Sequence, residues 1–266
     1  MIPGRDTPPT RDGAPRFFSR ANARFAPAMS GPVSELAHEV LHGPSLAMLK
    51  LDLAPGQSVT AEAGSMVAHA RDVRMDTRLN SDPAAGVFAS LWALFIALVR
   101  KVVGGETFFV NKFSSARGGT VWIAPTLAGQ VEYRLLRGER IVLSRGAYLA
   151  HAGNLHTRLV FGGLRALLAK EGLFFLEISG HGELWFTSYG GIHALDVRGS
   201  YLVDSGHLVA YEGALTFSVQ SSGGGLMGLV ASGEGLVCAF EGEGRVYIQA
   251  RNMESLAGWL EPLLPS

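Results

Sequence analysis

The sequence predicts an all-β protein in which one strand unit is repeated three times in tandem. Three observations support this prediction: glycine is unusually abundant, and two separate strand patterns each occur three times in the same order. The chain holds 34 glycines among 266 residues, roughly one in eight against a usual ~7%. Glycine enrichment without a collagen period indicates many tight turns between short strands.

The first repeated pattern ends in an aromatic residue on an alternating strand. ISGHGELWF at 178–186 aligns with FEGEGRVYI at 240–248 and, with two extra turn residues, with FSSARGGTVWI at 113–123. The aromatic residues are Trp122, Trp185 and Tyr247, which are 63 and 62 positions apart.

The second repeated pattern is a glycine followed by an apolar strand, an alanine and a ring-bearing residue. It reads GSMVAHA, GAYLAHA and GHLVAYE, at 64–70, 146–152 and 206–212. Two independent patterns in a matching order predict a tandem triplication. We expect three barrel- or sandwich-like units, similar to a double-stranded β-helix, in a pseudo-threefold arrangement. The predicted boundaries are a disordered Arg/Pro-rich tail at 1–30, repeat units at 31–128, 129–192 and 193–261, and a short tail at 262–266.

Two interpretations compete for Gly180-His181-Gly182: a phosphate or metal site, or the tip of a hairpin. A phosphate loop is followed by a helix whose amide groups point at the ligand, whereas an alternating strand follows these glycines. The third repeat has the same Gly-x-Gly pattern, with Glu243 in place of His181. We therefore predict a short hairpin tip, in which glycine supplies a positive φ.

Alternation assigns the two faces of these strands. Leu184 and Phe186 share one face and are expected in the core of their unit. The repeated aromatic residues fall on the opposite face, which is of mixed polarity. We expect another unit or subunit to cover that face, because aromatic rings bury a large area; the alternative is three partly exposed aromatic residues. The candidate interface residues are Trp122, Trp185 and Tyr247.

A crossover connects the strands within each unit, and the first crossover is unusually apolar. Short crossover helices are expected at 162–170 and 223–232, and a longer one at 84–103. Residues 83–99 carry no charge, and as a helix they would span ~25 Å, short of a ~30 Å hydrocarbon core. The sequence leaves three interpretations open: burial by oligomerisation, an interfacial membrane helix and a short transmembrane span. The candidate contact residues are Phe88, Leu91, Trp92, Phe95 and Leu98.

Charge and cysteine content argue against several classes of protein. The formal net charge is +0, so no global field attracts nucleic acid or an anionic membrane. The repeated strands also lack the basic edge with stacking aromatic residues that RNA recognition needs, so we predict no nucleic-acid partner. The single cysteine, Cys238, excludes an intrachain disulfide, and its apolar neighbours predict a buried thiol.

Several known catalytic motifs are missing from the sequence. It contains no Gly-x-Ser-x-Gly elbow and no P-loop. A cupin-type metal site needs a His-x-His pair, which is also missing. His69 and His151 are equivalent across the repeats, with Tyr211 in the third place, which favours a packing position. We therefore predict no catalytic residue, no cofactor and no metal site.

The spread of matching segments resembles the altered-inheritance-of-mitochondria protein family. These segments are LKLDLAPGQSVTAEAGSMVAHARDVRMDTRL, GGETFFVNKF, YLVDSGHLVAYEGALTFSV and GRVYIQARNMESL, within about residues 35–261. The resemblance implies repeated domains similar to the tryptophan RNA-binding attenuation protein and a compact trimer. For mitochondrial relatives it implies a role in inner-membrane organisation rather than catalysis. The Arg/Pro-rich tail and the apolar 84–99 segment depart from the family pattern.

The resulting hypothesis is a non-enzymatic, oligomeric scaffold, with a homotrimer favoured and a membrane surface or membrane protein complex as a candidate partner. A small-molecule binding module at inter-unit clefts is the alternative, and a cupin-type metal enzyme is the third class considered. We expect a cytoplasmic location, with the membrane periphery as the alternative.

Overall fold

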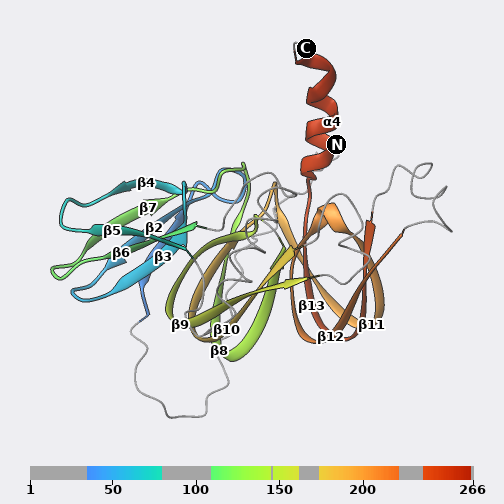
Figure 1. Cartoon of the computed structure of the whole chain (residues 1–266), viewed down its shortest axis with the longest axis horizontal. Coiled ribbons are helices and arrows are strands. Elements are labelled where there is room, and N and C mark those ends of the chain that lie inside the picture. The colour runs from blue at the N-terminus through green and yellow to red at the C-terminus, as the bar shows by residue number, and fades with distance from the viewer. Residues whose placement is uncertain (1–34, 80–108, 145, 162–173, 222–235, 265–266) are drawn as a thin grey trace, which may run out of the picture. The chain divides into compact units, whose positions relative to one another are not determined.

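The computed structural model describes residues 35–79, 109–144, 146–161, 174–221 and 236–264. All of them belong to one unit of the chain, Val33–Ser266. Strands dominate this part of the chain (Figure 1), which confirms the all-β prediction. Helical structure in the described residues is confined to α4 (Met253–Leu260) and two 3-10 turns, η1 (Ser205–His207) and η2 (Glu261–Leu263).

The described residues form seven short strands followed by six long ones. The short strands are β1 (Ala37–Leu41), β2 (Met48–Leu53), β3 (Ser58–Glu62), β4 (Met66–His69), β5 (Arg74–Leu79), β6 (Phe109–Ser114) and β7 (Gly119–Ile123). The long strands are β8 (Val131–Ser144), β9 (Tyr148–Phe161), β10 (Phe174–Thr187), β11 (Ile192–Asp204), β12 (Leu208–Ser221) and β13 (Leu236–Gln249).

Alternation of apolar and polar residues explains why the short strands form. In β2 the side chains of Leu49, Leu51 and Leu53 are buried, and the residues between them are half-buried. In β7 the same period buries Val121 and Ile123. A period of two places one face of each strand on the core.

The strands of the described residues form two open antiparallel sheets. The smaller sheet has the order β1-β2-β7-β4. The larger sheet has the order β11-β13-β12-β8-β10-β9-β3-β6-β5. Each sheet therefore ends in edge strands and is not closed into a barrel.

The prediction of a hairpin tip at Gly180-His181-Gly182 is wrong. β10 continues through these glycines and pairs on both sides of them with β8 and β9. The register with β8 shifts between Ser179 and His181, so the segment is an irregularity inside a bent strand. The Gly-x-Gly pattern suits either a turn or a bulge, and the pairing along the whole strand selects the bulge.

Each of the six long strands bends at an internal glycine with positive φ, and Figure 1 shows these strands as curved ribbons. At two bends the glycine is needed because neighbouring strands cross closely. A Cβ atom on Gly153 would lie 2.8 Å from the Cα of Gly182, and one on Gly213 would lie 2.7 Å from the Cα of Gly244. Both sites tolerate only a hydrogen atom there. The six glycines are Gly138, Gly153, Gly180, Gly199, Gly213 and Gly242.

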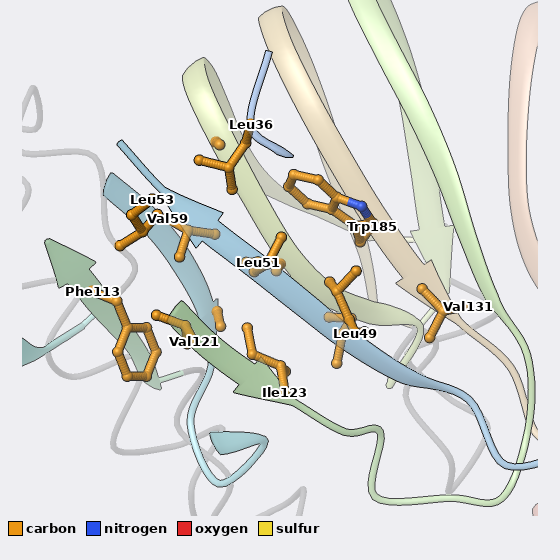
Figure 2. Packing of buried hydrophobic residues seen from close by; sticks show 14 of the residues in the cluster. Leu36, Leu49, Leu51, Leu53, Val59, Phe113, Val121, Ile123, Val131 and Trp185 are labelled. Carbon is orange, nitrogen blue, oxygen red and sulfur yellow. The ribbon is translucent and has the colours of Figure 1, made fainter. Parts of the chain in front are cut away.

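Buried hydrophobic residues of the described segments form three clusters. The first, shown in Figure 2, joins Leu49 and Val59 of the short strands to Val131 and Trp185 of the long strands. The second combines side chains from β8, β10, β12 and β13, and the third lies mainly among β11, β12 and β13. All three clusters therefore contain residues from more than one of the predicted repeat units.

Candidate functional site

The three repeated aromatic residues occupy equivalent places in the strand pairing. Trp122 lies opposite Ala68, Trp185 opposite Ala150, and Tyr247 opposite Ala210. In all three strand pairs the register shifts next to this position. The same local geometry therefore recurs at each aromatic residue.

These aromatic residues differ in their exposure. Trp185 is fully buried and Tyr247 is buried, so neither is a partly exposed strand aromatic. Trp122 is half-buried, and the Nζ atom of Lys50 lies 6.0 Å from its ring centroid. An ammonium group at that distance contributes a weak cation–π attraction.

Residues from the first predicted unit, together with Tyr133 of the second, cover the Trp185 ring. Its centroid lies 5.2 Å from the centroid of His38, in an edge-to-face arrangement, and 5.6 Å from that of Tyr133. Figure 2 shows the ring near Leu36, with Leu51 of β2 in the same cluster. The indole Nε1 atom is buried and has no hydrogen-bond partner among the described residues. Trp185 therefore joins β10 to the segment around Leu36 and His38 through apolar and ring contacts.

Glu183 is a buried carboxylate beside this aromatic cluster, with only 1% of its surface exposed. Its Oε2 atom accepts a hydrogen bond from the backbone N–H of Leu36 at 2.8 Å, and its Oε1 atom accepts one from the Tyr133 hydroxyl at 3.1 Å. Burial raises the pKa of Glu183, and these two hydrogen bonds partly oppose that rise. The carboxylate thus ties the N-terminal edge of the fold to β10.

A second carboxylate, that of half-buried Glu212, holds β12, β8 and β13 together. The Tyr247 hydroxyl donates a hydrogen bond to its Oε1 atom at 2.7 Å, and Arg134 donates to its Oε2 atom, also at 2.7 Å. Burial alone would lower the pKa of Arg134, but the hydrogen bonds and negative charge of Glu212 outweigh it and raise that pKa. Burial, followed by the contact with Glu212, likewise raises the pKa of Tyr247.

A cleft of about 720 Å³ lies beside the Arg134–Glu212 ion pair. Its charged side chains are balanced, because four arginines meet four carboxylates. Arg245 pairs with Asp196 at 2.9 Å, in addition to the pair formed by Arg134. The cleft is lined by Arg134, Glu139, Arg140, Asp196, Val197, Arg198, Glu212, Gly213, Glu243, Gly244 and Arg245. These residues come from the predicted second and third units, and inter-unit clefts belong to the alternative hypothesis of a small-molecule binding module.

A second cavity of about 500 Å³ lies next to α4. The helix begins after Asn252, whose side chain accepts hydrogen bonds from the backbone N–H groups of Glu254 and Ser255. Trp259 of α4 is exposed and lines this cavity together with His207. Sequence reasoning missed this helix, although an asparagine followed by an acidic first turn is a start signal.

The equivalent histidines and the cysteine act as packing residues. The Nδ1 atom of His151 lies 2.7 Å from the Tyr148 hydroxyl, and burial lowers the pKa of His151 to about 4. The Nδ1 atom of His69 lies 2.9 Å from the carbonyl oxygen of Ala70. Burial raises the pKa of the Cys238 thiol to about 12. Across the segments that the structure describes, no three histidine, cysteine or acidic side chains are grouped so that they could hold a metal ion.

The predicted contact residues of the first crossover lie outside the described residues. These are Phe88, Leu91, Trp92, Phe95 and Leu98. The segments 84–103, 162–170 and 223–232, predicted as crossover helices, lie outside them as well.

Comparison with known proteins agrees with the resemblance in the sequence. The sequence pattern of the family described as mitochondrial biogenesis AIM24 matches residues 38–251. An uncharacterized protein of Streptococcus pyogenes serotype M6 is 32% identical over 228 residues, which cover 82% of this chain and 87% of that protein. The X-ray structure of a Streptococcus pyogenes protein matches with a TM-score of 0.70 and 29% identity, over 86% of this chain and 100% of that chain. This chain therefore belongs to the mitochondrial biogenesis AIM24 family.

Proposed function

We propose that this protein is a non-enzymatic scaffold in which three tandem β units are joined by strand pairing, and that it works as a homo-oligomer. One observation carries the proposal: the described chain contains two inter-unit joints of the same kind. In the first, β3 pairs with β9, and in the second, β8 pairs with β12. Each joint consists of three antiparallel residue pairs.

Equivalent pairings support the three-unit organisation. Besides the matching aromatic positions, Val59, Ile141 and Tyr201 lie opposite Phe113, Ile178 and Phe240 respectively. These pairs occur at corresponding points of the three predicted units. A pseudo-threefold arrangement of those units is part of the proposal.

The contacts of buried Glu183 and half-buried Glu212 favour a structural role over a catalytic one. Glu183 and Glu212 are each engaged by two different residues through hydrogen bonds that connect separate strands or segments. A catalytic carboxylate needs a face open to a substrate. Here the oxygen atoms hold strands together.

Size-exclusion chromatography with light scattering tests the oligomeric scaffold. The chain has a mass of 28.3 kDa, so the favoured trimer corresponds to three times that mass, about 85 kDa. A multiple of the chain mass that persists on dilution would support the proposal. A mass of 28.3 kDa at every concentration would contradict it.

Membrane association is the second part of the proposal. None of the helices in the described part of the chain has the length and apolar character needed to cross a bilayer. Support comes instead from the uncharged sequence 83–99, which suits an interfacial segment. Sedimentation with vesicles of neutral and of anionic lipid should give similar binding, because the net charge is +0. Deleting 84–99 should abolish it; binding that survives the deletion would contradict this part.

A small-molecule binding module is the second candidate function, favoured by the cleft beside Arg134. Its volume of about 720 Å³ lies within the usual ~300–1,000 Å³ of ligand sites. A thermal-shift screen of zwitterionic metabolites would test this candidate. A true ligand should lose its stabilising effect in Arg134→Gln but keep it in Arg117→Gln, whose exposed arginine lies outside the cleft. Equal shifts in both variants would contradict the assignment.

A further inference from the structure

The two joints inside the chain show how one unit attaches to the next. At the centre of the first joint, Thr60 of β3 lies opposite His151 of β9. At the centre of the second joint, Val142 of β8 lies opposite Tyr211 of β12. Both joints are antiparallel and equal in length. We call the segments 59–61 and 141–143 the donor segments, and 150–152 and 210–212 the acceptor segments.

A third donor segment lies on β11. Within its own unit, the first residue of each donor segment lies opposite the first residue of the repeated pattern that starts at 113, 178 or 240. Val59 lies opposite Phe113, Ile141 opposite Ile178, and Tyr201 opposite Phe240. By this register the segment 201–203 is the third donor segment.

A third acceptor segment lies at the end of β4. The first residue of each acceptor segment is an alanine opposite the repeated aromatic residue, as Ala150 lies opposite Trp185. Ala68 lies opposite Trp122 in the same way. By this register the segment 68–70 is the third acceptor segment.

The third donor and acceptor segments each have one edge without a partner strand among the described residues. There, β11 pairs only with β13, and β4 pairs only with β7. Leu202 is 65% exposed and Tyr201 is 47% exposed, whereas the donor residues Val59 and Ile141 are buried in their joints. An edge strand with unpaired backbone groups and exposed apolar side chains is a template for adding another strand.

The chemistry of the two free segments fits this kind of addition. Neither 68–70 nor 201–203 contains Asp, Glu, Lys or Arg. Charged side chains of these kinds commonly protect edge strands from pairing. In the register of the joints, Tyr201 and Val203 would lie opposite Ala70 and Ala68, as the donor residue Leu143 lies opposite Ala210. Large residues facing alanines allow close packing across the pair.

We propose that the donor segment of β11 in one copy of the chain pairs with the acceptor segment of β4 in a second copy, with Leu202 opposite His69. This inference rests on the proposed oligomeric scaffold and names the surfaces that build it. The interface is head-to-tail, because two different edges meet, and such contacts form rings when the rotation closes. We assign the partner strand to a second copy of the chain. If the two edges could meet within one chain, their high effective concentration would favour pairing there. Both edges are nevertheless unpaired in the described fold.

Disulfide cross-linking between two variants, each with one introduced cysteine, tests this pairing. One variant carries Leu202→Cys and the other, fused to a mass tag, carries His69→Cys; the native Cys238 is buried and stays in both. Directly opposed strand residues have Cβ atoms ~4.5–5.5 Å apart, close to the distance that a disulfide bridges. After mixing and mild oxidation, we expect a reducible product that contains one tagged and one untagged chain. The matched control, Val67→Cys in place of His69→Cys, shifts the register by two residues and should give at least tenfold less product.

The outcomes separate this inference from the proposed scaffold. If the mixture gives no mixed product while light scattering still shows an oligomer, the edge assignment is wrong and the scaffold stands. If a double variant forms a disulfide only within one chain, the segments pair in the same chain and the inference is overturned. If the protein has the mass of one chain, both proposals fail. As a second variant, Leu202→Lys should reduce the oligomer to single chains that keep the wild-type circular dichroism spectrum, since that side chain is exposed. An unchanged oligomer would contradict the inference.

Discussion

Lowering the pH from 8 to 5 should destabilise this protein through His151, which lies at the centre of the joint between β3 and β9. The Tyr148 hydroxyl donates a hydrogen bond to the carbonyl oxygen of Thr60 at 3.1 Å and lies 2.7 Å from the Nδ1 atom of His151. Burial, assisted by the positive charge of Lys112, lowers the pKa of His151 from 6.5 to about 4.

The sign and size of the effect follow from proton binding. Between pH 6.5 and about 4, the unfolded chain binds a proton at this histidine and the folded chain does not. The free energy of unfolding therefore falls as the pH falls through this range. The loss should be about 2 kcal/mol at pH 5 relative to pH 8, and should approach about 3 kcal/mol below pH 4.

Urea unfolding at several pH values measures this effect. His151→Gln keeps a hydrogen-bond donor but cannot titrate, so its stability should vary less with pH than that of the wild type, by about 2 kcal/mol between pH 8 and pH 5. His156→Gln, at an exposed position on the same strand, is the control and should keep the wild-type pH dependence. If wild type and His151→Gln lose stability equally on acidification, the reasoning about this joint is refuted.

Substitutions at three further positions, two of them with a comparison variant, probe the core and the strand bends by chemical unfolding. Glu183→Ala should lower the free energy of unfolding by about 2–4 kcal/mol, because the Leu36 amide and the Tyr133 hydroxyl lose their acceptor. Glu183→Gln should lower it by less. This variant should also lack the loss of stability that the raised pKa of Glu183 causes as the pH rises above 4.5. Gly153→Ala should cost about 2 kcal/mol or more, because its φ is 88° and the Cα of Gly182 is close. Gly191→Ala, in open space without a positive φ, should be nearly neutral. Trp185→Ala should cost about 3–5 kcal/mol, and a cost below 1 kcal/mol would contradict its place in the core.

The strand content could be predicted from the sequence because alternation is a local signal. The buried residues of β2 and the recurrence of the aromatic positions follow from spacing alone. The meaning of the Gly-x-Gly patterns could not be read in the same way. A hairpin tip and a bulge both need a glycine with positive φ, and at Gly180 the choice depends on pairing with β8 and β9 along the whole of β10.

The buried polar contacts were out of reach for a similar reason. Glu183 stands on the side of β10 that alternation assigns to a mixed-polarity face, yet its backbone partner, Leu36, is 147 positions away in the sequence. Trp185 was correctly placed opposite Leu184 and Phe186, but all three are buried because other segments cover both faces of the strand. A local pattern reports which residues share a face and not what packs against that face.

Amide hydrogen exchange, measured at several protein concentrations, tests most directly the claim that strand pairing both joins the units and assembles the copies. Peptides that cover the two joints, such as those around Thr60 and Val142, should be protected equally at all concentrations. Peptides around Leu202 and His69 should gain protection as the concentration rises. Protection around Leu202 and His69 that does not depend on concentration, or rapid exchange at the two joints, would contradict the account.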